Sequence, residues 1–546
     1  MNDPKSSVPA ERVLILGAGL AGLSAAVRLA EAGRQVTVLE ATRAGGGRAR
    51  SFPDAATGRE LDNGQHLLMG CYRETLAFLR TIDSVDGIYF QRNLSVHMFK
   101  PGGKKMNLDC PALPAPLHLA TGLLAMRGLG LLDKAAVLRA GLVLRGEVAR
   151  PDDNETCDSW LRRLGQTPAL RNAFWDPLIW GTLNDDPLVS SAAMFTAVLE
   201  RAFLSTRDAS RLGVPKVPLS RLYVDQALTY LRARGSDVRV GEPVRALDIN
   251  GTQITGVTLK SGEQIEAGTV ISAVPPHAFL DLLAGTWPAH PVYQDIARLK
   301  TSPIVNLWFT VDRAPFTEPF VGLVGSPLHW MFNRSQIEGS EGGDVLMNCT
   351  ISGARACIDD PPEALQELLR GELERYFPGR VPTIRLFRAI KEKRATISHA
   401  AGTYHCRPET RGPIRGLYMA GDWVRTGLPA TIESAVQSGH DAAKAVLADA
   451  ATRDFRADER DAEADVNVPQ GSIHSSIQIP ISTTRRSRPD VLRLSTVPRR
   501  SPTGRHPQTT DRNSPTADVR SVRKTGDQRT LISAHGYGPQ AAPHDE

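Results

Sequence analysis

The chain has 546 residues, of which 41% are hydrophobic, and its formal net charge is +6. This length provides for two or three domains with a large buried core, and the hydrophobic content is that of a soluble protein. The positive excess is small for the length, so we expect no nucleic-acid partner. The six cysteines are scattered, without a C-x-x-C pair or a metal-type spacing with histidine, which predicts reduced thiols and no metal site.

The first predicted element is a strand over residues 13–16 that leads into a glycine-rich turn. Gly17, Gly19 and Gly22 follow in the spacing G-x-G-x-x-G. The first glycine permits a tight turn, the second lets the backbone approach a pyrophosphate, and the third lets the next helix pack closely on the strand. The spacing therefore predicts a dinucleotide-binding turn.

A helix over residues 20–32 and a strand over residues 35–39 complete a β-α-β unit. The helix begins with Leu20 and Ala21, and its N-terminal N–H groups would point at the phosphates. The strand ends at Glu40, about twenty residues past the glycines, where a carboxylate can accept hydrogen bonds from a ribose 2′-OH. Because an acid at this place disfavours a 2′-phosphate, NADP is disfavoured, and NAD and FAD remain.

A second glycine turn, formed by Gly45, Gly46 and Gly47 and followed by Arg48, separates these two cofactors. A flexible linker is the plain alternative. The turn resembles that of flavoproteins of the amine-oxidase and carotenoid-desaturase superfamily. This resemblance implies an FAD cofactor whose pyrophosphate and ribityl chain are wrapped by the turn, with Arg48 meeting the phosphates.

The segment ELDNGQHLLMGCY at residues 60–72 combines a polar turn, a histidine and two further glycines. It is similar to plant-type phytoene desaturases, and the longer string DNGQHLLMGCYRET resembles the hydroxysqualene dehydroxylases. In that superfamily the segment lies beside the flavin ring. His66 and Asp62 are therefore our candidates for a proton donor or its water network, while a structural histidine that shapes the turn is the alternative.

The stretch from 110 to 146 has a helical apolar period and predicts part of a helical substrate domain. Its most apolar part, residues 111–126, holds three prolines and is too short and broken to span a bilayer, although it could touch one peripherally. Residues 174–203 carry aromatic side chains and a helix start expected near 185–187. Such apolar walls suit either a long hydrocarbon or an ordinary helical core.

Alternating apolar runs between 238 and 266 predict strands joined by turns, and the run at 269–276 predicts a buried strand. In the superfamily such a meander returns the chain to the FAD-binding domain, which implies that Val244 lies near the adenine. Further elements are expected as strands at 304–310 and 345–350, a helix at 362–376, and a solvated sheet edge at 388–394.

The segment GLYMAGDWVRTGLPATIESAVQSG at residues 416–439 also resembles the hydroxysqualene dehydroxylases. It predicts a strand that ends before Gly421 and Asp422, whose carboxylate would accept hydrogen bonds from the ribityl or pyrophosphate region. A helix is expected to begin near Pro429 and to turn its positive end toward the flavin, which stabilises negative charge near N1 and O2. The predicted contacts of this turn with the cofactor are Pro429, Ala430 and Thr431.

Beyond residue 451 Ser, Thr, Pro and Arg dominate, which predicts a disordered tail. It is either a basic arm for anionic lipid or a translation of unselected GC-rich DNA. We expect an α/β protein with a Rossmann-like FAD-binding domain and an inserted α+β, amine-oxidase-like substrate domain. The predicted segments are 10–75, 216–285 and 406–450 for the FAD-binding domain, 76–215 and 286–405 for the substrate domain, and 451–546 for the tail.

The resemblance covers residues 12–447 and implies an FAD-dependent oxidoreductase that converts hydroxysqualene to squalene in hopanoid or triterpenoid biosynthesis. Loss of water would be assisted by a proton donor, with hydride delivered from flavin N5. The alternatives are a carotenoid-type desaturase, which moves hydride the other way, and a non-catalytic isoprenoid-binding scaffold. The implied partners are a long isoprenoid, other squalene-pathway enzymes and a membrane surface, in a cytoplasmic protein without an export signal.

Overall fold

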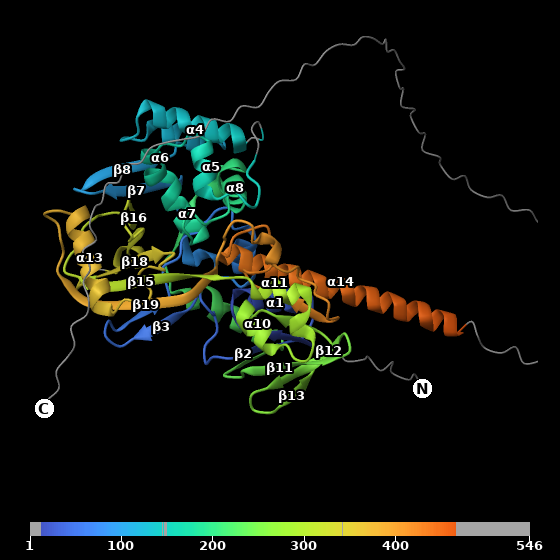
Figure 1. Cartoon of the computed structure of the whole chain (residues 1–546). Helices are drawn as coiled ribbons and strands as arrows, with labels where there is room; N and C mark the ends of the chain where they lie inside the picture. Colours follow the sequence, from blue (N-terminus) through green and yellow to red (C-terminus); the bar gives the residue numbers. More distant parts are fainter. Residues whose placement is uncertain (1–11, 145, 147–149, 341, 466–546) are drawn as a thin grey trace, which may run out of the picture. The chain divides into compact units, whose positions relative to one another are not determined.

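A computed structural model describes residues 12–144, 146, 150–340 and 342–465, which build two large sheets (Figure 1). The first sheet has five strands, and every neighbouring pair is parallel. Four of its strands are buried, whereas the edge strand at residues 237–240 is half charged, and all five come from three distant stretches of the chain. In spatial order they are β10 (Asp237–Val240), β2 (Val36–Glu40), β1 (Val13–Leu16), β14 (Val270–Ser272) and β20 (Leu417–Met419).

Two helices from opposite ends of the chain pack together at this sheet, α1 (Leu20–Glu31) and α14 (Ile432–Asp465). A Cβ placed on Gly439 of α14 would lie 2.2 Å from the carbonyl oxygen of Ala21. Only glycine permits this approach, and the Ser24 hydroxyl donates across it to the carbonyl of Val436 at 3.2 Å. The N-terminal and C-terminal motifs are thereby held side by side.

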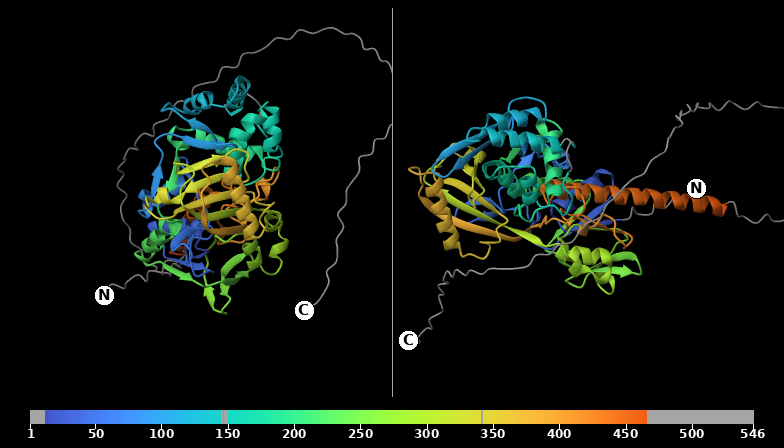
Figure 2. Two further views of the ribbon diagram at one scale, coloured as in Figure 1. Left: turned by 90° about the vertical axis from the view of Figure 1, so that its left-hand side faces the viewer. Right: turned by 45° about the horizontal axis from the view of Figure 1, so that its top comes forward.

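The second sheet has seven strands, and its longest members, β15 and β19, pair antiparallel along most of their length. Figure 2 shows α13 (Pro362–Tyr376) lying across this sheet, where it buries Leu365, Leu369 and Leu373 against the strands. The order is β19 (Ile384–Ile397), β15 (Thr301–Val311), β18 (Val345–Ser352), β17 (Trp330–Asn333), β16 (Phe320–Leu323), β7 (Ser95–Lys100) and β8 (Lys104–Asp109).

Smaller elements surround the two sheets. β11, β12 and β13 form an antiparallel meander, and β5, β9 and β6 form another small sheet. The helices between residues 117 and 199 share a core that contains Trp160 and Phe195. Further helices are α2 (Arg73–Thr81), α3 (Leu117–Ala125), α4 (Leu131–Leu144), α5 (Cys157–Arg163), α7 (Asp176–Leu183), α8 (Ala192–Leu199), α9 (Gln226–Arg232), α10 (Pro276–Leu282), α11 (Pro291–Ala297) and α12 (Arg334–Glu338). Further strands are β3 (Ser51–Asp54), β4 (Arg59–Asp62), β5 (Leu68–Met69), β6 (Ile88–Phe90), β9 (Leu212–Pro215), β11 (Val244–Asn250), β12 (Gln253–Leu259) and β13 (Gln264–Glu266).

Most predicted strands and helices are confirmed, and α13 has the predicted bounds. The run at 388–394 lies in β19, an edge strand of its sheet, as expected. Two helix starts were predicted too early. After α7 the next helix begins at Ala192, because Ser191 supplies its cap by accepting from the Met194 N–H at 3.3 Å.

The last helix differs from expectation at both ends. It begins at Ile432 rather than near Pro429, because the Thr431 hydroxyl accepts from the Ser434 N–H at 3.2 Å. It then continues through Asp465, so residues 451–465 are helical and not part of a disordered tail. The prediction for 466–546 lies outside the described residues, and the domain boundaries remain predictions.

Candidate functional site

In the first glycine turn there is open space beside Gly19 but none beside Gly22. Gly17 has φ +99°, which favours glycine. A Cβ on Gly22 would lie 1.9 Å from the Gly17 carbonyl oxygen, so this glycine is required for α1 to pack. By contrast, a Cβ on Gly19, which caps α1, would have no atom within 4 Å. The open side of Gly19 is where a pyrophosphate can reach the backbone.

Glu40 closes the turn from the end of β2. Its carboxylate accepts from the Ala18 N–H at 2.8 Å and from the Thr42 N–H at 2.9 Å. The Glu242 N–H donates to the Glu40 carbonyl at 2.9 Å, which brings the start of β11, with Val244, to the same end of β2. The residues predicted for the ribose and the adenine therefore lie near one another.

The second glycine turn lies directly against the first. The Gly46 N–H donates to the Ala18 carbonyl at 2.7 Å, and a Cβ on Gly47 would be 3.5 Å from the Cα of Gly19. Gly46 and Gly47 have φ of +99° and +56°. A turn made of residues without side chains thus extends the open surface beside Gly19.

Arg48 and Asp422, which lie 374 residues apart in the chain, form an ion pair. The Arg48 Nη2 donates to Asp422 Oδ1 at 2.7 Å, and its Nη1 donates to the Ala395 carbonyl at 2.6 Å. Burial by itself would lower the pKa of Arg48, but the charge of Asp422, its hydrogen bond and the charge of Glu392 together outweigh burial and raise that pKa. The Asp422 carboxylate is buried, whereas the side chain of Arg48 stays 38% exposed.

These residues fit an FAD molecule. The glycine cradle offers room for a pyrophosphate, the helix α1 points its N-terminus there, and Glu40 and Asp422 supply carboxylates at the two ends. The fit rests on parts from both termini, held together by the contact of α1 with α14.

Two residues that the sequence did not mark as functional hold residues 428–431, which we call the turn before α14. His399 donates from Nδ1 to the Leu183 carbonyl at 2.7 Å, and its Nε2 accepts from the Ala430 N–H at 2.7 Å. The buried Arg407 donates to the Leu428 carbonyl at 2.7 Å. They fix the predicted contact residues Pro429, Ala430 and Thr431. No local pattern marks them, because each partner is distant in the chain.

The His399 contacts predict a pH effect on stability. Burial lowers the pKa of His399 to about 3, while an unfolded histidine titrates near 6.5. The unfolded state therefore gains a proton first as pH falls. The free energy of unfolding is highest above about pH 6.5 and decreases progressively toward pH 3, and it is about 2 kcal/mol lower at pH 5. Urea midpoints at pH 7.5 and 5.0 measure this loss. His399→Gln, which can keep both hydrogen bonds, should show a smaller difference, and an equal difference would contradict the assignment.

The segment around His66 lies between the glycine turn and the seven-stranded sheet. The Asn63 side chain donates to the Arg48 carbonyl at 3.2 Å, and Asn306 of β15 donates to the Asn63 carbonyl at 3.1 Å. The imidazole Nδ1 of His66 is 2.7 Å from the Gly64 carbonyl and must carry the proton, which leaves Nε2 as an acceptor. Burial lowers the pKa of His66, so the ring is neutral near pH 7.

Asp62 is better suited than His66 to hold a proton. Its carboxyl is buried, with Oδ1 accepting from the Ser51 hydroxyl at 2.7 Å and from the Leu219 N–H at 3.0 Å. Burial raises the pKa of Asp62, and its Oδ2 has no hydrogen-bond partner among the described residues. A neutral carboxyl could donate from Oδ2, whereas the neutral His66 can only receive a proton at Nε2.

The role of His66 can be separated from its structural contact. His66→Ala removes Nε2 and should lower turnover by about 100-fold, within the range of general acid–base effects, while flavin remains bound. Turnover of the flavin-loaded variant measures this directly. His66→Asn, which can still donate to the Gly64 carbonyl, is the matched control. Unchanged turnover in His66→Ala would leave only the structural role.

A small, mainly apolar cavity of about 30 Å³ lies at the turn before α14. Glu433 lies on this cavity and caps α2, because its carboxylate accepts from the Thr75 N–H at 2.9 Å and the Glu74 N–H at 3.0 Å. Burial raises the pKa of Glu433. The cavity is lined by Met69, Cys71, Tyr72, Thr182, Val198, Arg201, Leu428, Pro429, Thr431 and Glu433.

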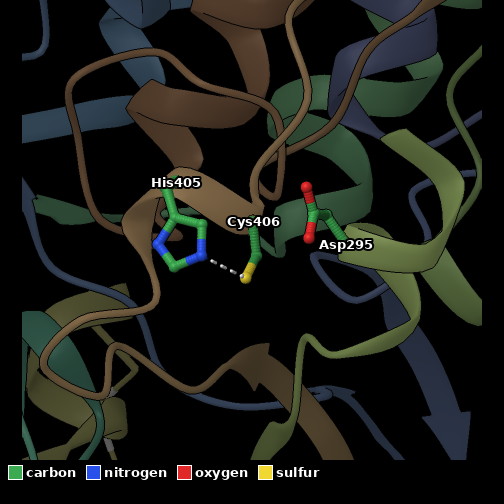
Figure 3. Close-up of side chains that lie close together, drawn as sticks. All are labelled: Asp295, His405 and Cys406. Carbon is green, nitrogen blue, oxygen red and sulfur yellow. Dashed lines mark hydrogen bonds between the residues drawn. The ribbon is translucent and has the colours of Figure 1, made fainter. Parts of the chain in front are cut away.

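A further cluster joins Asp295 of α11 to His405 and Cys406 (Figure 3). Cys406 Sγ lies 3.4 Å from His405 Nε2, and the possible ligand atoms lie within 4.8 Å of one another. However, Arg298 Nη1 already pairs with Asp295 at 3.2 Å. A divalent cation would face this guanidinium, so the electrostatics disfavour a metal.

The parallel sheet, the paired glycine turns and the carboxylates at their ends define a dinucleotide-binding protein of the α/β type. The model of the flavin-containing amine oxidoreductase family matches residues 20–447. The chain belongs to this family and is an FAD-dependent oxidoreductase. Among the described residues, no helix has the length and apolar character needed to cross a membrane.

Several relatives match this chain over nearly their whole length. Hydroxysqualene dehydroxylases of Sinorhizobium fredii and Rhodopseudomonas palustris are 31% and 30% identical, covering 81% and 80% of this chain and 100% and 98% of their own. The 15-cis-phytoene desaturase of Synechococcus elongatus is 25% identical over 80% of this chain and 96% of its own. The chain is thus related to enzymes named for two isoprenoid substrates.

Solved structures share the fold at lower identity. An oxidoreductase from Methanosarcina mazei has a TM-score of 0.64 and 19% identity, covering 79% of this chain and 99% of its own. Cyclohexylamine oxidase from Brevibacterium oxydans has a TM-score of 0.61 and 17% identity, covering 81% and 99%. These likenesses confirm the predicted amine-oxidase-like α/β fold.

Proposed function

We propose that this protein reductively removes the hydroxyl group of hydroxysqualene to give squalene. The observation that carries the proposal is the full-length similarity to two hydroxysqualene dehydroxylases at 30% and 31% identity. This reaction would place the protein in hopanoid or triterpenoid biosynthesis.

FAD would be held by the residues that line the two glycine turns. The backbone at Gly17, Gly19 and Gly22 would approach the pyrophosphate, and Glu40 would accept from the ribose. Asp422 would accept hydrogen bonds from the ribityl region while it keeps Arg48 in place. When bound, reduced flavin supplies a hydride equivalent.

In this reaction a C–O bond breaks and a C–H bond forms, so the departing oxygen needs a proton to leave as water. The proposed proton source is Asp62 in its protonated form, which burial favours; Nε2 of His66 would receive this proton and pass it to the departing oxygen. The apolar walls Met69, Val198 and Leu428 would exclude solvent from the developing cation. The His399 and Arg407 contacts would keep the turn before α14 in one position.

A carotenoid-type desaturase is the second candidate. It is supported by the 25% identity to a phytoene desaturase over 96% of that enzyme. The same cofactor residues and apolar walls would serve, but the hydride would leave the substrate. The direction of hydride transfer separates the two proposals.

An anaerobic experiment decides the direction. The purified protein is reduced chemically, hydroxysqualene is added, and the flavin spectrum and the extracted lipid are followed together. Reoxidation with formation of squalene is expected. If the flavin stays reduced, while phytoene reduces the oxidised protein in a parallel cuvette, the dehydroxylase proposal fails and the desaturase proposal replaces it.

A further inference from the structure

Exposed large apolar side chains are concentrated in one short part of the described chain. Eleven such side chains are exposed in all, and six of them are leucines between residues 113 and 138. Leu131 and Leu132, at the start of α4, are 87% and 81% exposed. We call these six the leucine patch: Leu113, Leu117, Leu124, Leu131, Leu132 and Leu138. Exposed apolar side chains concentrated in one short segment indicate an interaction surface.

The leucine patch is not a poorly packed core. On their inner sides α3 and α4 bury other residues, among them Leu123, Ala136 and Val137, in the core shared by the helical segments. A helix that is apolar on its inner side as well as its outer side departs from the ordinary amphipathic pattern of a surface helix. With 9 and 14 residues, α3 and α4 are too short to span a bilayer.

Between residues 111 and 141 the charged side chains are mainly positive. Arg127 and Arg139 are exposed. The one acid between residues 111 and 141, Asp133, is used internally, because its carboxylate accepts from the Gly130 N–H at 2.7 Å and from the Thr167 hydroxyl. Cations beside apolar side chains complement a surface that is anionic outside and apolar beneath, which is the character of a lipid interface.

We propose that α3 and α4 dock the protein onto anionic lipid bilayers. The leucine patch would enter the boundary between headgroups and acyl chains, while Arg127 and Arg139 meet the lipid phosphates. Figure 1 places α4 at the top of the described chain, on the side away from β11 and β13. The core beneath these helices includes Met69, which also lines the apolar cavity. These helices thus share a core with one residue of the cavity, and this binding does not depend on which lipid is the substrate.

Flotation of the full-length protein with vesicles tests this proposal. Vesicles of phosphatidylglycerol and phosphatidylcholine should carry the protein upward, and phosphatidylcholine alone should carry less. The double variant Leu131→Glu/Leu132→Glu should bind about tenfold more weakly or worse, because two leucines no longer enter the bilayer. Both side chains are exposed, so the fold should persist, which circular dichroism and bound flavin check.

Two controls identify the surface responsible. Leu386→Glu places the same charge on another exposed leucine, in the edge strand β19, and should float like the wild type. Arg485→Glu/Arg486→Glu reverses cations near the C-terminus and should also float. The proposal is overturned if the patch variant floats unchanged, or if only the C-terminal variant loses binding. It is equally overturned if the wild-type protein does not float with vesicles and sedimentation shows instead that the patch variant dissociates a dimer.

Discussion

Replacing Gly19 by valine is expected to give a folded protein that purifies without flavin. The backbone at Gly19 has φ −75° and ψ 177°, which valine adopts readily, and its Cβ would meet no protein atom within 4 Å. The added methyl groups would instead occupy the space where the pyrophosphate approaches. FAD affinity should fall by about 100-fold or more, equivalent to about 2.7 kcal/mol. Absorbance near 450 nm per protein, together with thermal unfolding of the apoprotein, measures both outcomes.

The neighbouring variant Gly22→Ala is the matched comparison. A Cβ there would lie 1.9 Å from a backbone oxygen, so the close packing of α1 on the strand would be lost. We expect destabilisation of about 3 kcal/mol, at the upper end of overpacking effects, besides loss of flavin. If Gly19→Val keeps its flavin, or unfolds as Gly22→Ala does, the cofactor does not approach the backbone at Gly19.

Asp422→Ala should also reduce FAD retention, by about tenfold to 100-fold. The variant removes a buried carboxylate and leaves Arg48 with its Ala395 contact alone. The cofactor would lose a hydrogen-bond acceptor, and Arg48, which is predicted to meet the phosphates, would lose its position. Equilibrium dialysis of the apoprotein against FAD gives the affinity directly.

The control for this variant is a second aspartate that also pairs with an arginine. Asp449 accepts from Arg411 at 2.8 Å on the outer part of α14, away from the glycine turns. Asp449→Ala should retain flavin fully, because it breaks the Arg411 pair and the 2.7 Å hydrogen bond from the Tyr418 hydroxyl but no contact of Arg48 or of the glycine turns. Asp422→Asn, which can still accept from Arg48, should fall between the wild type and Asp422→Ala. A fully yellow Asp422→Ala protein would show that this carboxylate does not serve the cofactor.

Local sequence was sufficient to predict the elements that depend on residues close together in the chain. The turn at Gly17, the strand that ends at Glu40 and the helix at 362–376 follow from glycine geometry and apolar period within a few residues. The same holds for the meander that begins at Val244. The starts of α8 and α14 were predicted too early, because proline and aspartate are common near helix starts while the caps themselves are Ser191 and Thr431.

The predictions of FAD and of the fold class depended on the family resemblance, because glycine turns by themselves do not distinguish FAD from NAD. By itself the sequence determined where the nucleotide-binding turns are, because each depends on a few adjacent residues. Only the tertiary structure decided that Arg48 pairs with Asp422 and that His399 and Arg407 hold the turn before α14. It also decided that His66 is neutral and that the leucine patch faces outward. Such features depend on burial and on partners hundreds of residues away, which no local pattern encodes.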